Sequence, residues 1–200
     1  MPKKDWKNWG KVPYYNLESL IKISNIYKKL FKLYNINTLK MEVLEMGCGH
    51  GRFTLILNKM FKKIIAVDPE KILINMLNNK INEMKINNKN NKNEKIITIN
   101  SDCSNLKFNK KFDMVIFSYS FMWINNKKKC LLNVNKLIKK NGYLLIIEPI
   151  KFMNILDKKF IKPRKLMIDT IKITIKSNKY DLIHFCNLQK SNIIYLLKKI

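Results

Sequence analysis

Short apolar runs alternate with longer amphipathic stretches along most of this 200-residue chain. Runs of strand length, each with apolar residues at its centre, cover 41–45, 64–68, 95–99, 112–117 and 143–147. Between the second and third runs, Ile72, Met76, Leu77 and Ile81 recur at helical spacing. Strands that alternate with helices predict a parallel sheet built by right-handed crossovers.

The two ends of the chain extend this pattern. Helical spacing predicts a helix over 16–34 near the start and another over 158–177. A third helix is expected over 131–140, ended by a left-handed turn at Asn141-Gly142. Two β-prone runs, 180–185 and 192–197, can pair as an antiparallel hairpin. The expected fold is α/β, a three-layer sandwich around a mostly parallel seven-stranded sheet with an antiparallel terminal hairpin.

A glycine-rich loop follows the first expected strand. It reads Gly47-Cys-Gly49-His-Gly51 and leads into an apolar helical segment. A dinucleotide fingerprint needs a further glycine at position 52, where this chain has Arg52. Glu45 precedes the first glycine by two residues, and a carboxylate there suits a ligand that carries an ammonium group. The alternative is an ordinary tight turn between strand and helix.

This loop and its flanks resemble a known family motif. The stretch 44–54 is similar to motif I of the class I S-adenosylmethionine-dependent methyltransferases. The segments 102–108, 112–118 and 141–149 resemble later motifs of the same family, in the same order. The resemblance covers about residues 38–200 and implies one Rossmann-like methyltransferase domain over 1–200, in which residues 1–37 form a helical cap and 38–200 the core.

The resemblance also implies the ligand contacts. The cofactor would be S-adenosylmethionine, with Asp68 at the ribose hydroxyls and with Asp102 and Cys103 at the adenine. A carboxylate suits the ribose because it accepts two hydrogen bonds at once. The expected cofactor-binding residues are Glu45, Gly47, Cys48, Gly49, Gly51, Arg52, Asp68, Pro69, Asp102, Cys103 and Ser118.

Residues 118–124 are most similar to the ubiquinone/menaquinone, malonyl-carrier and trans-aconitate (type 11) members of the superfamily. The expected reaction is direct in-line methyl transfer to a small molecule or a protein group. Met122 stands where many relatives carry His or Gln, so no catalytic residue is assigned. Two alternatives stay open: an RNA (tRNA or cap) methyltransferase, and an inactive donor-binding scaffold or activator subunit.

Composition bears mainly on partners and location. The net charge is +26, but of 40 basic residues only Arg52 and Arg164 are arginine. Phosphate recognition favours arginine, so this lysine excess is better explained by a drift in amino-acid composition than by a phosphate-binding function. RNA stays a possible partner. Four cysteines lie far apart without a Cys-x-x-Cys pair, so neither a metal site nor a disulfide framework is expected. The chain has no apolar run of membrane-spanning length and no signal-peptide pattern, which predicts a cytoplasmic protein, expected to be a monomer.

Overall fold

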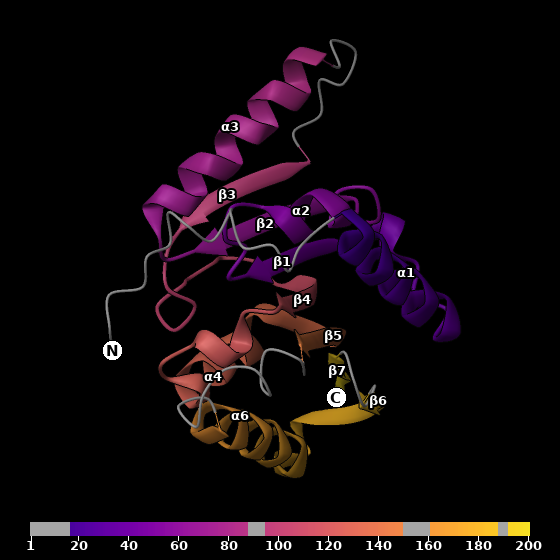
Figure 1. The fold of residues 1–200 in the computed structure, drawn as a ribbon. Helices are drawn as coiled ribbons and strands as arrows, with labels where there is room; N and C mark the ends of the chain where they lie inside the picture. Colours follow the sequence, from indigo (N-terminus) through magenta and orange to yellow (C-terminus); the bar gives the residue numbers. More distant parts are fainter. Residues whose placement is uncertain (1–16, 88–94, 150–160, 188–191) are drawn as a thin grey trace.

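A computed structural model describes residues 17–87, 95–149, 161–187 and 192–200 of the chain. Its centre is a seven-stranded sheet with strand order β3-β2-β1-β4-β5-β7-β6 (Figure 1). The strands are β1 (Glu42–Met46), β2 (Lys63–Asp68), β3 (Ile96–Asn100), β4 (Phe112–Ser118), β5 (Ile138–Pro149), β6 (Tyr180–Asn187) and β7 (Asn192–Lys199). Only β7 runs against its neighbours, so the expected mostly parallel sheet with a terminal antiparallel hairpin is confirmed.

Helices cover both faces of this sheet. They are α1 (Leu17–Leu33), α2 (Arg52–Leu57), α3 (Lys71–Asn87), α4 (Lys127–Leu137) and α6 (Ile161–Thr174), with the shorter turns η2 (Thr38–Lys40), η3 (Phe121–Trp123) and η5 (Ile175–Lys179). Side chains of α1, α2 and α3 join one buried cluster with one face of the sheet, and those of α4 and α6 join a second cluster with the other face (Figure 1). The expected three-layer sandwich is therefore present.

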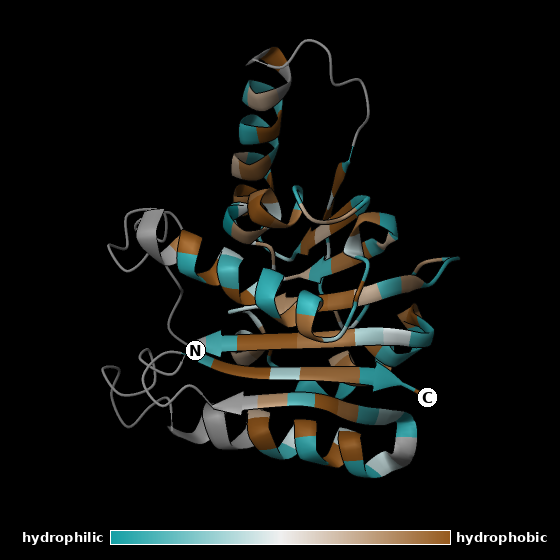
Figure 2. Cartoon of the chain, turned by 90° about the vertical axis from the view of Figure 1, so that its right-hand side faces the viewer, coloured by the Kyte–Doolittle hydropathy of each residue, from teal (hydrophilic) through white to brown (hydrophobic). Residues whose placement is uncertain are grey.

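The central strands are buried because their residues are apolar on both faces, as is usual for parallel sheets. Val43 and Leu44 are both completely buried, although adjacent strand residues point to opposite faces. In Figure 2 the middles of the strands are brown and several of their ends are teal. The polar residues are thus left for the two edges of the sheet where strands begin and end.

The helix α1 lies along a face of the sheet, although a cap over the ligand end was expected of residues 1–37 (Figures 1 and 2). Its residues Ile23, Tyr27 and Phe31 are buried in the same cluster as Met114 and Ile116 of β4. The Tyr27 hydroxyl lies 2.5 Å from the Ser118 hydroxyl at the end of β4, in a fully buried position. The rest of the expected cap, residues 1–16, lies outside the described residues.

The predicted helix over 131–140 is wrong at both ends. The helix α4 begins four residues earlier, because the Asn126 side chain caps it by accepting a hydrogen bond from the Lys129 backbone N–H. It ends at Leu137, and Ile138 already pairs with Phe112 of β4. The left-handed residue is Asn141, with φ of 61°, but it lies within an irregularity of β5 rather than at a helix end.

The helix predicted over 158–177 is present as α6 followed by the π-helical turn η5, and residues 158–160 lie outside the described part of the chain. No helix among the described residues is long and apolar enough to cross a membrane. The described residues also hold no group of three or more His, Cys, Asp or Glu side chains that could bind a metal ion.

Candidate active site

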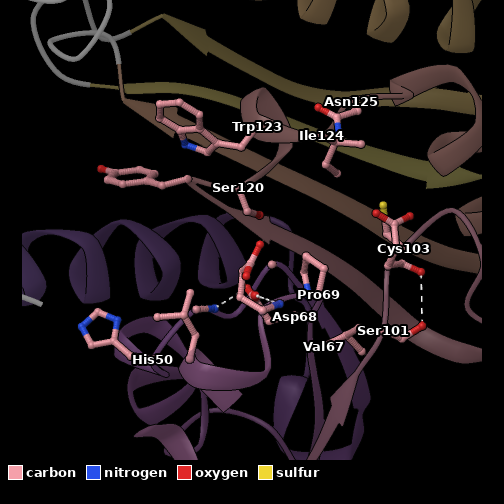
Figure 3. A pocket seen from close by; sticks show the side chains of 16 residues that line it. His50, Val67, Asp68, Pro69, Ser101, Cys103, Ser120, Trp123, Ile124 and Asn125 are labelled. Atoms are coloured by element: carbon pink, nitrogen blue, oxygen red, sulfur yellow. Dashed lines mark hydrogen bonds between the residues drawn. The ribbon is translucent and has the colours of Figure 1, made fainter. Parts of the chain in front are cut away.

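A pocket of about 340 Å³ opens at the edge of the sheet where β1 to β4 end (Figure 3). Its wall comes from the four loops that follow these strands, and ligand sites of α/β sheets are expected at this edge. The volume falls within the usual range for pockets that hold a small organic molecule. Six of the predicted residues line it: Gly47, Gly49, Asp68, Pro69, Asp102 and Cys103.

Asp68 ends β2 and lies on the floor of this pocket with 6% of its surface exposed. Its two carboxylate oxygens accept backbone hydrogen bonds from Gly49, at 2.8 Å, and from Glu70, at 2.9 Å (Figure 3). Burial raises the pKa of the Asp68 carboxyl, and the two N–H groups oppose that shift. A carboxylate has about four lone-pair positions, so these two bonds leave acceptor capacity for two hydroxyl groups of a ligand.

The three glycines of the loop are required for two different reasons. A Cβ on Gly47 would lie 2.5 Å from Cβ of Ser120, and one on Gly51 would lie 2.1 Å from a methyl carbon of Leu77. A Cβ on Gly49 would meet no protein atom within 4 Å, although its φ of +56° disfavours side chains. Gly49 therefore presents bare backbone to the pocket, while Gly47 and Gly51 allow close packing.

The loop after β3 supplies Asp102 and Cys103. Asp102 is exposed and accepts a hydrogen bond from the Ser104 backbone N–H at 2.7 Å, whereas Cys103 is buried. The Asn133 side chain of α4 donates to the carbonyl oxygens of Cys103 and Leu106, both at 2.8 Å. These two bonds hold the loop against α4 and so fix this part of the wall.

Five of the predicted residues are beside the pocket but do not line it: Glu45, Cys48, Gly51, Arg52 and Ser118. Glu45 is 1% exposed, and its carboxylate accepts a hydrogen bond from the Thr54 hydroxyl at 2.6 Å. Burial raises the Glu45 pKa to about 8. The side chain lies beneath the glycine loop instead of facing the pocket, because the first turn of α2 brings Thr54 over it.

The wall opposite Asp68 was largely missed by sequence reasoning. It is formed by Tyr119, Ser120 and Trp123, which follow β4 (Figure 3). Tyr119 has φ of 57°, a conformation that side chains rarely adopt and that is common at functional sites. Trp123 lines the pocket and also packs against the buried cluster that holds α4 and α6.

Two buried ionisable residues support this wall from behind. The Glu148 carboxylate, at the end of β5, accepts a hydrogen bond from the Met122 backbone N–H at 3.1 Å. The Lys127 ammonium group donates to the carbonyl oxygens of Met122, at 3.0 Å, and Ile124, at 2.7 Å. Glu148 is completely buried, which raises its pKa to about 8. These bonds hold Met122, in the middle of the short turn η3, and Ile124, just after it, and Trp123 lies between these two residues.

The charge of the pocket is opposite to that of the protein. Asp68, Glu70 and Asp102 line it, whereas no lysine or arginine does so among the described residues. His50 also lines it, and its pKa is lowered to about 4 by burial and then by the charges of Lys80 and Arg52. The imidazole is therefore neutral at pH 7. Although the net charge is +26, the lysines and arginines of the described residues lie outside the lining of this pocket.

A pocket at the strand ends of a parallel sheet, with a bare glycine loop and a buried carboxylate after β2, defines the class of nucleoside-binding α/β proteins. Comparison with known proteins gives the family. Residues 37–198 match the model of the family described as "Methyltransferase domain", so the chain belongs to this methyltransferase family, as its motifs predicted.

Individual relatives agree with this assignment. The chain is 29% identical over 108 residues to the malonyl-[acyl-carrier protein] O-methyltransferase of Priestia megaterium, a match that covers 53% of this chain and 36% of the relative. It is 28% identical over 141 residues to the ubiquinone biosynthesis O-methyltransferase of Rickettsia akari, covering 70% of this chain and 53% of the relative. The chain thus spans about a third to a half of the length of these curated relatives.

A solved structure confirms the fold. The S-adenosylmethionine-dependent methyltransferase from Clostridium acetobutylicum superimposes with a TM-score of 0.66 at 15% identity, over 97% of this chain and 96% of that one. The expected Rossmann-like methyltransferase fold is therefore present.

Proposed function

We propose that this chain transfers a methyl group from S-adenosylmethionine to a small-molecule or protein acceptor. The observation that carries the proposal is Asp68, a buried carboxylate at the end of β2 that faces a pocket beside the bare backbone of Gly49. A carboxylate held in this way can accept hydrogen bonds from two neighbouring hydroxyl groups, which the ribose of the donor provides.

The other pocket residues suit the rest of the donor. Asp102 and Cys103 occupy the loop where the family resemblance places the adenine. The donor carries a sulfonium and an ammonium charge, and a pocket lined by three carboxylates favours a cation. The Glu45 carboxylate lies just below the loop, and its Oε1 atom is buried without a described hydrogen-bond partner. Because burial raises the Glu45 pKa to about 8, this carboxyl is mostly protonated at pH 7 and adds negative potential only at higher pH.

The acceptor would lie against Tyr119 and Trp123. This side of the pocket is aromatic, and no lysine or arginine among the described residues lines the pocket to hold a phosphate or a carboxylate. A neutral or cationic acceptor group with a flat apolar part therefore fits better than a polyanion. For this reason we favour a small molecule or a protein side chain over RNA as the acceptor.

Bound S-adenosylmethionine supplies an activated methyl group on a good leaving group. The chain's own residues then have to bind, orient and exclude water, which can account for most of the rate enhancement. Trp123 and Tyr119 shield the site from one side. His50 also lines the pocket, but its pKa of about 4 makes it a weak base, so no residue is assigned as a general base.

The proposal is tested by replacing Asp68 with alanine and titrating the protein with S-adenosylhomocysteine. Hydrogen bonds to a charged acceptor contribute roughly 1.5–3 kcal/mol, so Asp68→Ala should weaken binding by about ten- to a hundredfold or more. The matched control is Asp181→Ala, because Asp181 is an exposed aspartate of β6 at the opposite edge of the sheet. The control should bind like the wild type.

Asp68→Ala should also lower the melting temperature, because the N–H groups of Gly49 and Glu70 lose their acceptor. The titration is therefore done well below the melting temperature of the variant. Wild-type affinity in folded Asp68→Ala protein would show that the ribose is not bound here.

A methyl-transfer assay separates an enzyme from an inactive donor-binding scaffold. The protein is incubated with methyl-labelled S-adenosylmethionine and, separately, with small-molecule, protein and RNA fractions of a cell extract. We expect label in the small-molecule or protein fraction. Donor binding without transfer to any fraction would favour the scaffold, and label in the RNA fraction alone would favour the RNA methyltransferase.

A further inference from the structure

Lysines are concentrated at the edge of the sheet opposite the pocket. Each strand from β2 to β7 has a lysine at this edge, within or next to the strand, and Lys40 precedes β1. We call six of them the lysine rim: Lys62, Lys95, Lys111, Lys140, Lys179 and Lys198. All are exposed except Lys198, which is partly buried.

The strand pairing places these lysines side by side. Lys63, next to Lys62, pairs with Glu42 at the start of β1, and Lys198 pairs with both Tyr143 of β5 and Asp181 of β6. In Figure 2 this edge is on the right, where β7 ends in teal at the label C. Because neighbouring strands are about 4.8 Å apart, seven strands form an edge roughly 30 Å long.

Among the described residues, three acidic residues at the same edge offset part of this charge: Glu42, Asp113 and Asp181, the last of which pairs with Lys198. Glu42 already binds Lys110 at 2.5 Å, and Asp113 binds Lys139 at 2.7 Å, and neither lysine belongs to the rim. The pKa of Lys199 is lowered, first by burial and then by the charges of Lys111 and Lys179. Lysines in or next to three different strands, β4, β6 and β7, therefore repel one another, and a bound anion would relieve that repulsion.

The shape of the edge identifies the kind of anion. Neighbouring strands rotate by roughly 20–25° relative to one another, so the rim is a curved line and not a plane. A flat membrane surface can touch only part of such a line, whereas a flexible chain of phosphates can follow it. The lysine ammonium group binds phosphate as a point charge, without the fixed paired hydrogen bonds of an arginine guanidinium. Lysines therefore suit a contact with the phosphate backbone that does not depend on base sequence.

We propose that the lysine rim binds the sugar-phosphate backbone of a single-stranded nucleic acid. The bound nucleic acid does not enter the pocket, because the rim and the pocket lie at opposite ends of the sheet strands. Strand β4, of seven residues, separates these two ends by roughly 20 Å. The rim is thus a docking surface in addition to the methyl-transfer site, and the proposal is independent of the function proposed above.

The test measures binding of a fluorescent 20-nucleotide poly(U) RNA, and of the matching poly(dT) DNA, by anisotropy at 50–200 mM salt. The rim variant carries Lys62→Gln, Lys111→Gln and Lys140→Gln. For single strands the slope of log affinity against log salt is about −0.7 per phosphate contact, so the variant should lose about 2 units of slope. At 0.1 M salt this corresponds to roughly a hundredfold weaker binding.

The control variant removes the same charge elsewhere, as Lys71→Gln, Lys128→Gln and Lys129→Gln. These lysines lie at the starts of α3 and α4, near the pocket edge of the sheet. The control should lose less than about fivefold in affinity, because its lysines contact no phosphate in the proposed complex. Equal losses in the two variants would overturn the proposal, since diffuse charge would then explain binding.

Two further arms complete the test. Replacing the three rim lysines by arginine keeps the charge and should retain binding, which separates loss of charge from loss of folding. Vesicles that contain phosphatidylserine test the alternative source of phosphate. Binding to vesicles that depends on the rim, without binding to either oligonucleotide, would overturn the proposal, whereas a preference for RNA or for DNA identifies the nucleic acid.

Discussion

Gly49→Val is expected to abolish donor binding while leaving the protein folded. Gly49 has φ of +56°, and a Cβ built there meets no protein atom within 4 Å. A side chain at this position therefore projects into the pocket and not into the core. Valine at position 49 must adopt the left-handed backbone conformation, which lowers the free energy of unfolding by about 1–2 kcal/mol. For a chain of this size, that loss lowers the melting temperature by about 2–8 °C.

Its cost to the ligand is much larger. Three valine carbons would occupy space beside the backbone that the donor needs, and a loss of at least a hundredfold in affinity corresponds to about 2.8 kcal/mol or more. The assay combines a thermal melt with a calorimetric titration of S-adenosylhomocysteine. At a hundredfold excess over its Kd, the ligand stabilises the wild type by about 2.7 kcal/mol, and this stabilisation should fall to about 0.4 kcal/mol or less in Gly49→Val.

The comparison variant is Gly51→Val. Gly51 also has positive φ, of +86°, but its Cβ would lie 2.1 Å from Leu77, which is completely buried. Overpacking of this kind costs typically another 1–3 kcal/mol, so Gly51→Val should melt below Gly49→Val. Wild-type affinity in Gly49→Val would refute the reasoning, because the ligand would then not approach the glycine backbone. A melting temperature of Gly49→Val below that of Gly51→Val would refute the distinction between the two glycines.

Two further predictions concern buried polar groups. Burial raises the Glu148 pKa from 4.5 to about 8, so its contribution to stability is present below pH 4.5 and is lost as pH rises toward 8. Urea unfolding should show that the free energy of unfolding of the wild type is a few kcal/mol lower at pH 8.5 than at pH 5, and that this difference is smaller in Glu148→Gln. Equal differences in the two proteins would contradict this prediction. Tyr27→Phe leaves the buried Ser118 hydroxyl without its partner and should cost about 1–3 kcal/mol. The double variant Tyr27→Phe/Ser118→Ala should cost less than the sum of the single variants, and strict additivity would show that the two hydroxyls do not interact.

The sequence was sufficient for most of the fold because the strands are apolar on both faces and the helices are amphipathic. The main error, at α4 and β5, has a local cause. Leu137 and Ile138 continue the helical spacing of α4, so periodicity alone cannot show that the chain leaves the helix between them. Pairing of Ile138 with Phe112 decides the boundary, and that contact is not visible in a local pattern.

Residues of the candidate site were predicted only where they lie in a stretch that resembles a family motif. The glycine loop, Asp68 and Asp102 lie in stretches that resemble family motifs, and they do surround one pocket. Glu45 was predicted at the ligand because it precedes the loop, but the packing of Thr54 over its carboxylate could not be inferred from spacing. Tyr119 also lines the pocket, and its positive φ could not be expected from the sequence because non-glycine residues rarely adopt it.

The central claim is that this pocket binds S-adenosylmethionine, and the most direct test is calorimetric titration of the unmodified chain with S-adenosylhomocysteine and, in parallel, with NAD. We predict saturable binding of S-adenosylhomocysteine at one site and no binding of NAD, because Arg52 replaces the glycine that a dinucleotide loop requires. Binding of NAD by a protein that is indifferent to S-adenosylhomocysteine would contradict the account.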